Sequence, residues 1–232
     1  MDTNSRITFT NNPYPDGHHI NTFLWSGRID PDRGLVFDFH LITDNYYGED
    51  DNTNEEPDNL PDWQSKIVWH NYHKCTLSSK AWGSDGIVVA RAGNKFDFDN
   101  GFPVILEADP LPLDEDVEWD DLAIAIYLLG HDACAGHQIN IKSEENGLYT
   151  IHWTGKIALA YSGEDEFKYD FVADINAVTF DGIYYPQEWS QALALEKLTE
   201  LVSNPHRFTF QDLNPKSFKR EYKLVLQNET IA

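Results

Sequence analysis

The chain has 232 residues, 41% of them hydrophobic and 13% aromatic, and its 39 acidic and 17 basic residues give a formal net charge of −22. This composition excludes an intrinsically disordered chain, because apolar and aromatic residues are plentiful enough to form a core. The charge repels phosphates and anionic lipids, so we expect neither nucleic-acid binding nor membrane binding.

Alternation of apolar and polar residues predicts β-strands along most of the chain. In the first half the predicted strands cover residues 21–29, 34–43, 66–72, 86–92 and 103–107. In the second half they cover 122–129, 138–142, 148–161, 166–175 and 177–185, with closing strands near 206–210 and 222–227. Glycine and asparagine in the short connections at 143–147 and 162–165 favour hairpin turns. We therefore expect a mainly β protein whose antiparallel sheets pack in a sandwich-like arrangement.

One amphipathic α-helix is predicted from about residue 187 to 203, near the C-terminus. Pro186 suits the start of a helix, and Asn204 followed by Pro205 suits its end. Apolar residues recur at steps of three and four and form one face, which we expect to cover a sheet: Ala194, Leu195, Leu198, Leu201 and Val202.

The two halves of the chain share short motifs in the same order. FLWSGRI at 23–29 is matched by IHWTGKI at 151–157, and each is preceded by Gly-His-x-Ile-Asn, at 17–21 and at 136–140. These matches predict an internal duplication of a β-rich unit of about 110 residues. We assign the first unit to 1–110 and the second to 111–232; they can pack separately or as one domain.

Three potential metal ligands stand three residues apart in the segment GHDACAGHQINI: His131, Cys134 and His137. Imidazole and thiolate are preferred zinc ligands. On a strand, however, residues three apart face opposite sides, and the positions of the first unit that correspond to His131 and Cys134 hold Asn12 and Pro15, which are not zinc ligands. We therefore interpret the three residues as structural and keep a metal site as an alternative. No cofactor is predicted.

Signatures of other catalytic sites are absent from the sequence. It contains no Gly-x-Ser-x-Gly elbow, no phosphate-binding glycine loop and no His-Glu-x-x-His. The aromatic residues could stack on sugar rings, and paired carboxylates could cleave glycosides, but no spacing defines such a pair. A protein without catalysis is the leading hypothesis, and a metal-dependent or carbohydrate-binding protein is the alternative.

Negative charge is concentrated in two segments, 44–62 and 107–121, neither of which contains lysine or arginine. Such segments attract a basic protein, as in bacterial immunity proteins that neutralise basic toxins, although only the charge is analogous. The other readings are a solvated surface that keeps the protein soluble, or a structural protein. Under the leading hypothesis the partner-binding residues are Glu49, Asp50, Asp51, Glu55, Glu56, Asp114, Glu115 and Asp116.

The cellular compartment is predicted to be the cytoplasm. The N-terminus lacks the pattern of a secretory signal, and no stretch comes near the roughly 18 apolar residues of a membrane span. Cys75 and Cys134 suit a reducing compartment as free thiols, although two cysteines could also form one disulfide.

Overall fold

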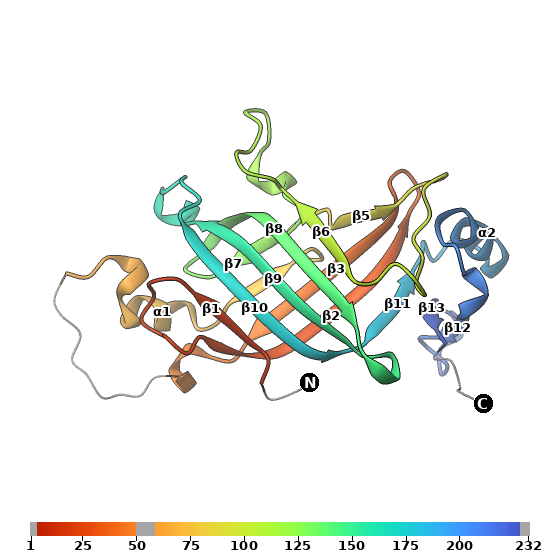
Figure 1. The fold of residues 1–232 in the computed structure, drawn as a ribbon, viewed down its shortest axis with the longest axis horizontal. Helices are drawn as coiled ribbons and strands as arrows, with labels where there is room; N and C mark the ends of the chain where they lie inside the picture. The colour runs from red at the N-terminus through yellow and green to blue at the C-terminus, as the bar shows by residue number, and fades with distance from the viewer. Residues whose placement is uncertain (1–3, 50–58, 228–232) are drawn as a thin grey trace.

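A computed structural model describes residues 4–49 and 59–227, and its centre is a closed antiparallel barrel of eight strands (Figure 1). Each strand of the barrel pairs with the next one along the chain, and the last returns to pair with the first. The strands are β1 (Arg6–Phe9), β2 (His18–Asp30), β3 (Gly34–Thr43), β4 (Thr76–Ser78), β7 (Ala125–Tyr127), β8 (His131–Ser143), β9 (Tyr149–Ala158) and β10 (Tyr169–Val178). The prediction of antiparallel β structure is confirmed. The sandwich is wrong, because a two-residue period shows which side chains face inward but not which strands pair.

Five further strands extend the sheet beyond the barrel. β5 (Ile87–Ala90) pairs with β3, and β6 (Val104–Ala108) pairs with β8. β11 (Phe180–Tyr184) runs parallel to β2 and continues the sheet into β13 (Tyr222–Leu226) and β12 (Phe208–Asp212). The short 3₁₀ helices are Tyr46–Glu49, Asp62–Gln64, Trp119–Asp121, Glu145–Gly147, Ala160–Ser162 and Pro205–Arg207.

Aromatic side chains fill the inside of the barrel. Trp25 and Trp153 are fully buried, and their rings lie 5.4 Å from Phe37 and 5.8 Å from Phe39, respectively. An eight-stranded barrel is just wide enough for side chains to fill it or for one small ligand to occupy it. Here side chains from β2, β3 and β9 meet across the interior, so the barrel encloses a packed core.

The segment predicted as a strand at 66–72 is instead a helix, α1 (Lys66–Tyr72). The strand prediction relied on alternation of apolar and polar residues, but Ile67 is 67% exposed. Ser65 is the N-cap, and the helix buries Trp69, whose indole Nε1 donates to the carbonyl of Trp63 at 2.9 Å. Tertiary burial of one tryptophan has therefore overridden the local β propensity.

The predicted C-terminal helix is present as α2 (Gln191–Leu201), shorter at both ends than 187–203. Its N-cap Ser190 accepts a hydrogen bond from the backbone of Leu193, and Val202 already bridges to Phe96 in an extended conformation. The buried side is formed by Ala194, Leu198 and Leu201. Within residues 4–49 and 59–227, no helix combines the length and apolar character needed to cross a membrane.

The two predicted units, 1–110 and 111–232, each contribute four strands to the barrel. Some repeated features recur in space: Gly17 and Gly136 both have positive φ, of 67° and 63°, and each precedes a buried histidine. Others do not, because His18 and Trp25 share strand β2, whereas His137 and Trp153 lie on the adjacent strands β8 and β9. The duplication therefore stays a prediction.

Both seams between the halves, β1 with β10 and β4 with β7, are needed to close the barrel. Fragments 1–110 and 111–232, expressed separately, are therefore expected to remain unfolded, because each would expose unpaired strand edges and half of the aromatic core. Amide dispersion in two-dimensional NMR spectra measures this. Dispersed signals from either fragment alone would show an autonomous unit, and mixing the two fragments provides the control for complementation.

Candidate functional site

The three potential zinc ligands all lie on β8 but in different surroundings. His131 is exposed and its ring contacts Trp82 and Tyr127, at 5.4 and 5.3 Å. Cys134 is fully buried, and its thiol donates to the carbonyl of Ile124 at 3.2 Å. His137 is also buried, within an irregularity in the strand pairing between Ala135 and Gln138. Each side chain therefore has its own protein contacts instead of a common centre.

His137 forms a polar pair inside the apolar wall of the barrel. Its Nδ1 accepts from the indole Nε1 of Trp153 at 3.2 Å. An indole nitrogen can only donate, so neutral His137 carries its proton on Nε2. That Nε2 lies 4.0 Å from Oδ2 of Asp109, a side chain that is 15% exposed. The geometry makes His137 an acceptor for Trp153 and a neighbour of one carboxyl group.

Two other side chains of types that bind zinc, on His70 and Cys75, also have local contacts of their own. The ring of His70 stacks on Tyr47, with 3.9 Å between centroids, and Cys75 is a fully buried free thiol. Cys134 is likewise free. Across the described residues, no group of three or more His, Cys, Asp or Glu side chains is arranged to hold a metal ion.

Most of the predicted binding residues of the first acidic segment, 44–62, lie outside the part of the chain that the structure describes. Asp50, Asp51, Glu55 and Glu56 lie outside the described residues, and Glu49 is described only as the last backbone position of the 3₁₀ helix Tyr46–Glu49. Their role as partner-binding residues therefore remains a prediction. The second acidic segment, by contrast, is described throughout.

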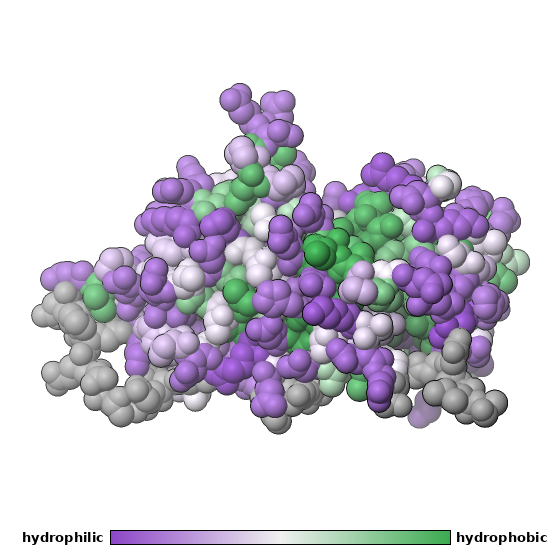
Figure 2. Space-filling view, viewed as in Figure 1, coloured by the Kyte–Doolittle hydropathy of each residue, from purple (hydrophilic) through white to green (hydrophobic). Residues whose placement is uncertain are grey.

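That second segment forms a loop between β6 and β7 that projects from the barrel, and we call residues 110–121 the acidic loop (Figure 1). Hydrophilic side chains cover its tip in the space-filling view (Figure 2). The predicted residues Asp114, Glu115 and Asp116 are all exposed. The carboxylates of the loop belong to Asp114, Glu115, Asp116, Glu118, Asp120 and Asp121. None of them has an ion pair with a described residue.

The base of the acidic loop is held firmly against the barrel. The carboxylate of Asp109 accepts from the backbone N–H of Ala123 at 3.0 Å, which ties the two ends together. Leu113 packs on a small apolar cluster formed by Leu122, Ala133 and Ala158. Both ends of the loop are therefore attached to the barrel.

Two apolar side chains are exposed among these carboxylates. Val117 is 37% exposed and Trp119 is 39% exposed. The sequence reasoning missed them because it treated tryptophan mainly as a core residue, which holds for the fully buried Trp25, Trp63, Trp69 and Trp153. The sequence did contain one signal for an exposed tryptophan: Trp119 lies in a segment that lacks the alternation of apolar and polar residues typical of a buried strand. An exposed tryptophan surrounded by charge is typical of a binding surface.

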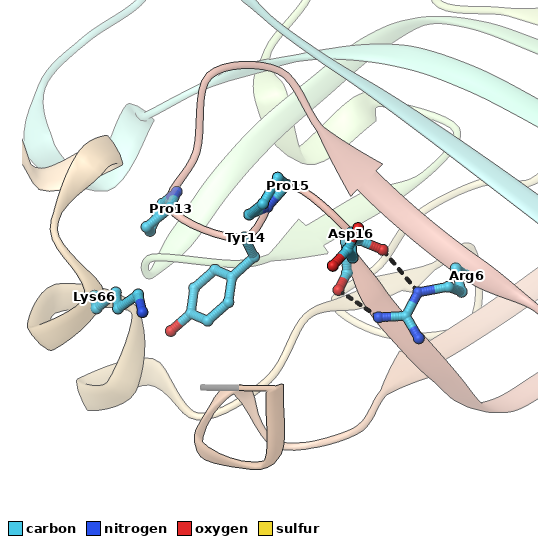
Figure 3. Close-up of a pocket in the computed structure, with 7 residues that line it drawn as sticks. Arg6, Pro13, Tyr14, Pro15, Asp16 and Lys66 are labelled. Carbon is cyan, nitrogen blue, oxygen red and sulfur yellow. Dashed lines mark hydrogen bonds between the residues drawn. The ribbon is translucent and has the colours of Figure 1, made fainter. Parts of the chain in front are cut away.

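A polar pocket of about 610 Å³ lies at another part of the surface, beside the loop that precedes β2 (Figure 3). Arg6 borders it, but its guanidinium donates to the carbonyls of Asp16 and Gly17, at 2.7 and 2.8 Å. The glycine is required here, since a Cβ on Gly17 would lie 2.3 Å from the carbonyl oxygen of Ile7. Arg6 therefore has a structural role in bracing this loop.

Comparison with known proteins identifies no relative: no family model, no curated protein and no solved structure matches the chain.

The pair formed by Asp109 and His137 predicts two opposite effects of pH on stability. Burial raises the pKa of Asp109 to about 6, against a hydrogen bond from the Ala123 backbone that lowers it. Burial lowers the pKa of His137 to about 4, partly opposed by the Cys134 backbone. The stabilising contribution of Asp109 is thus present below pH 3.8 and lost as pH rises through about 6. That of His137 is present above pH 6.5 and lost as pH falls through about 4.

Relative to wild type, Asp109→Asn is expected to become more stable as pH rises from 4 to 7, and His137→Asn as pH falls over the same range. Each slope should be at most about 1.4 kcal/mol per pH unit. Urea unfolding at several pH values measures both, and taking differences from wild type cancels the effect of the remaining carboxylates. Slopes of the same sign for the two variants would contradict the assignment.

Proposed function

We propose that the protein is a non-catalytic cytoplasmic interaction module that binds a basic protein through the acidic loop. The main support for this proposal is that the acidic loop projects from the barrel and that its exposed carboxylates have no ion pairs with described residues. In a chain of net charge −22, these carboxylates add to a long-range field that attracts a cationic surface. Charge complementarity of this kind raises the association rate and selects the partner.

Trp119 and Val117 supply the apolar part of the proposed interface. Tryptophan is among the residues that contribute most to binding energy when a partner covers them, and a ring of polar groups around it excludes water. We propose that the partner has an apolar pocket for Trp119, rimmed by lysine or arginine. The packed interior of the barrel supports a surface site, because aromatic side chains occupy the space where small barrels hold a ligand. The buried free thiols of Cys75 and Cys134 are compatible with a reducing compartment.

The interaction is tested by affinity capture with the purified protein as bait at low and high salt. We expect a basic protein that binds at low salt and is released as salt screens the charges. Trp119→Ala should weaken its binding at least tenfold, as loss of an anchor costs about 2 kcal/mol or more. The double variant Asp114→Asn, Glu115→Gln should lower the association rate and the salt dependence.

Matched control variants separate the loop from general effects of charge and exposed aromatic area. Phe218→Ala removes an exposed ring elsewhere, and Asp165→Asn, Glu166→Gln neutralises two exposed carboxylates in the β9–β10 connection. Both should bind like wild type. Capture of the same partner by the Trp119→Ala variant with unchanged affinity would refute the proposal, as would capture of no partner that salt releases.

A further inference from the structure

A second polar cluster lies on the outer face of β3. Phe37 and Phe39 of this strand point into the barrel, so the alternate residues Asp38 and His40 point outward. Asp38 is nevertheless only 1% exposed. Its carboxylate accepts from Nε of Arg28 at 3.0 Å and from the hydroxyl of Ser79 at 3.1 Å. A buried charge this well bonded marks a built site, because burying a carboxylate without such partners is costly.

The wall above Asp38 is the loop 79–86, between β4 and β5. Gly86 has φ of 67°, and a Cβ there would lie 2.6 Å from Oδ1 of Asp38. Only glycine therefore lets the loop approach the carboxylate this closely. The backbone N–H of Gly86 donates to the carbonyl of Ala123 at 3.0 Å, which fixes the end of the loop.

Most of the charges around this wall are paired. Arg28 also bonds Asp30 at 2.9 Å, and Nη1 of Arg33 lies 3.2 Å from Oδ1 of Asp85. Lys223, on β13, donates to Asp181 at 2.7 Å.

Lys80 is the exception. Within the part of the chain that the structure describes, no carboxylate lies within ion-pair distance of its ammonium group. The ring of Tyr184 lies beside that group, with 5.0 Å between Nζ and the ring centroid. Lys80 is exposed and thus has no direct ion pair, while the more distant carboxylates of Asp38 and Asp181 attract its charge.

Lys80 borders a pocket of about 410 Å³ whose lining also includes Arg28, Asp38, Ser79, Ser84, Asp85 and Tyr184. The two carboxylates of this lining are already paired, Asp38 with Arg28 and Asp85 with Arg33. This volume lies in the range of small-molecule sites. The hydroxyl of Tyr184 donates to Asp181 at 2.7 Å and can still accept, and the half-buried Ser84 hydroxyl has no hydrogen-bond partner among the described residues. One unpaired ammonium group beside a hydroxyl that can donate suits a single negatively charged oxygen group.

We infer that this pocket binds a small molecule through a carboxylate or phosphate group placed on the ammonium group of Lys80 and the hydroxyl of Ser84. The site is separate from the acidic loop and does not rest on the proposed protein partner. Its ligand is small, since the pocket is bounded by the loop 79–86 on one side and by β11 on the other.

The state of Lys80 provides an additional readout. Partial burial lowers the pKa of its amine, an effect that Asp38 and Asp181 oppose and that Arg28 and Lys223 reinforce. A bound anion should raise this pKa toward its ordinary value, because an opposite charge favours the protonated form. Labelled lysine side-chain signals in NMR spectra can follow the change.

Titration of the full chain with inorganic phosphate and, separately, with acetate tests the inference, with chloride keeping the ionic strength constant. We expect saturable shifts of the backbone amides of residues 79–86 with at least one probe, and a rise in the pKa of Lys80 at saturation. The probe with the lower dissociation constant identifies the group. Lys80→Gln should raise that constant at least tenfold.

Lys95→Gln is the matched control, since Lys95 also borders a pocket, but one that includes Glu196 and Glu200. It should bind the probes like wild type. Circular dichroism would verify that both variants are folded. The inference is overturned if neither probe gives saturable shifts, or if Lys80→Gln binds as tightly as Lys95→Gln.

Discussion

Closure of the sheet between β1 and β10 is the constraint on which the rest of the structure depends. Ile7 pairs with Ala173 and Phe9 with Phe171, so residues far apart in the chain must meet before either strand has a neighbour on both sides. Beyond the strand end, Thr10 extends the seam by a backbone bond to Asp170, and its carbonyl accepts from the indole of Trp63. Without this seam the barrel would be an open sheet with two free edges and an exposed aromatic face.

Once the barrel is closed and its interior filled by Trp25, Trp153 and their phenylalanine neighbours, the chain can bind only on its outside. The strands supply polar groups there by simple alternation, as Asp38 and His40 do between Phe37, Phe39 and Leu41. Loops inserted between the shorter strands supply the rest. The strands therefore form the scaffold, and the proposed binding groups lie on its outer face and in the loops between its strands.

The sequence predicted the long strands well, because the alternation of apolar and polar residues is strong in segments such as 148–161. It could not predict the barrel, since closure depends on pairing between β1 and β10, for which no local pattern exists. The helix α1 was wrongly predicted as a strand, because its burial depends on Trp69 packing against an aromatic cluster of distant residues, including Phe9 and Tyr46. Apolar periodicity found α2, but the position of its N-cap depends on a single hydrogen bond from Leu193.

The candidate sites also differ in how far local sequence patterns could predict them. Charge clustering identified the acidic segment at once, because neighbouring residues carry the charge, whereas the proposed anchor, Trp119, became evident only from its exposure. The pocket beside Lys80 also brings together Asp38 and Tyr184, and no spacing in the sequence relates these residues. One signal was present, a carboxylate and an imidazole in the otherwise apolar strand at 34–43.

The two candidate binding regions meet at one residue of the backbone. Ala123 donates its N–H to Asp109, at the base of the acidic loop. Its carbonyl accepts from Gly86, at the end of the loop 79–86 that borders the pocket beside Lys80. Both loops are therefore fastened to the same short strip that leads into β7. Because Gly86 also sets the approach to Asp38, a shift of this strip would alter both the wall of the pocket and the base of the acidic loop. Adjacency of this kind permits coupling between two ligands, but its size depends on whether the strip has two distinct arrangements with different affinities for each.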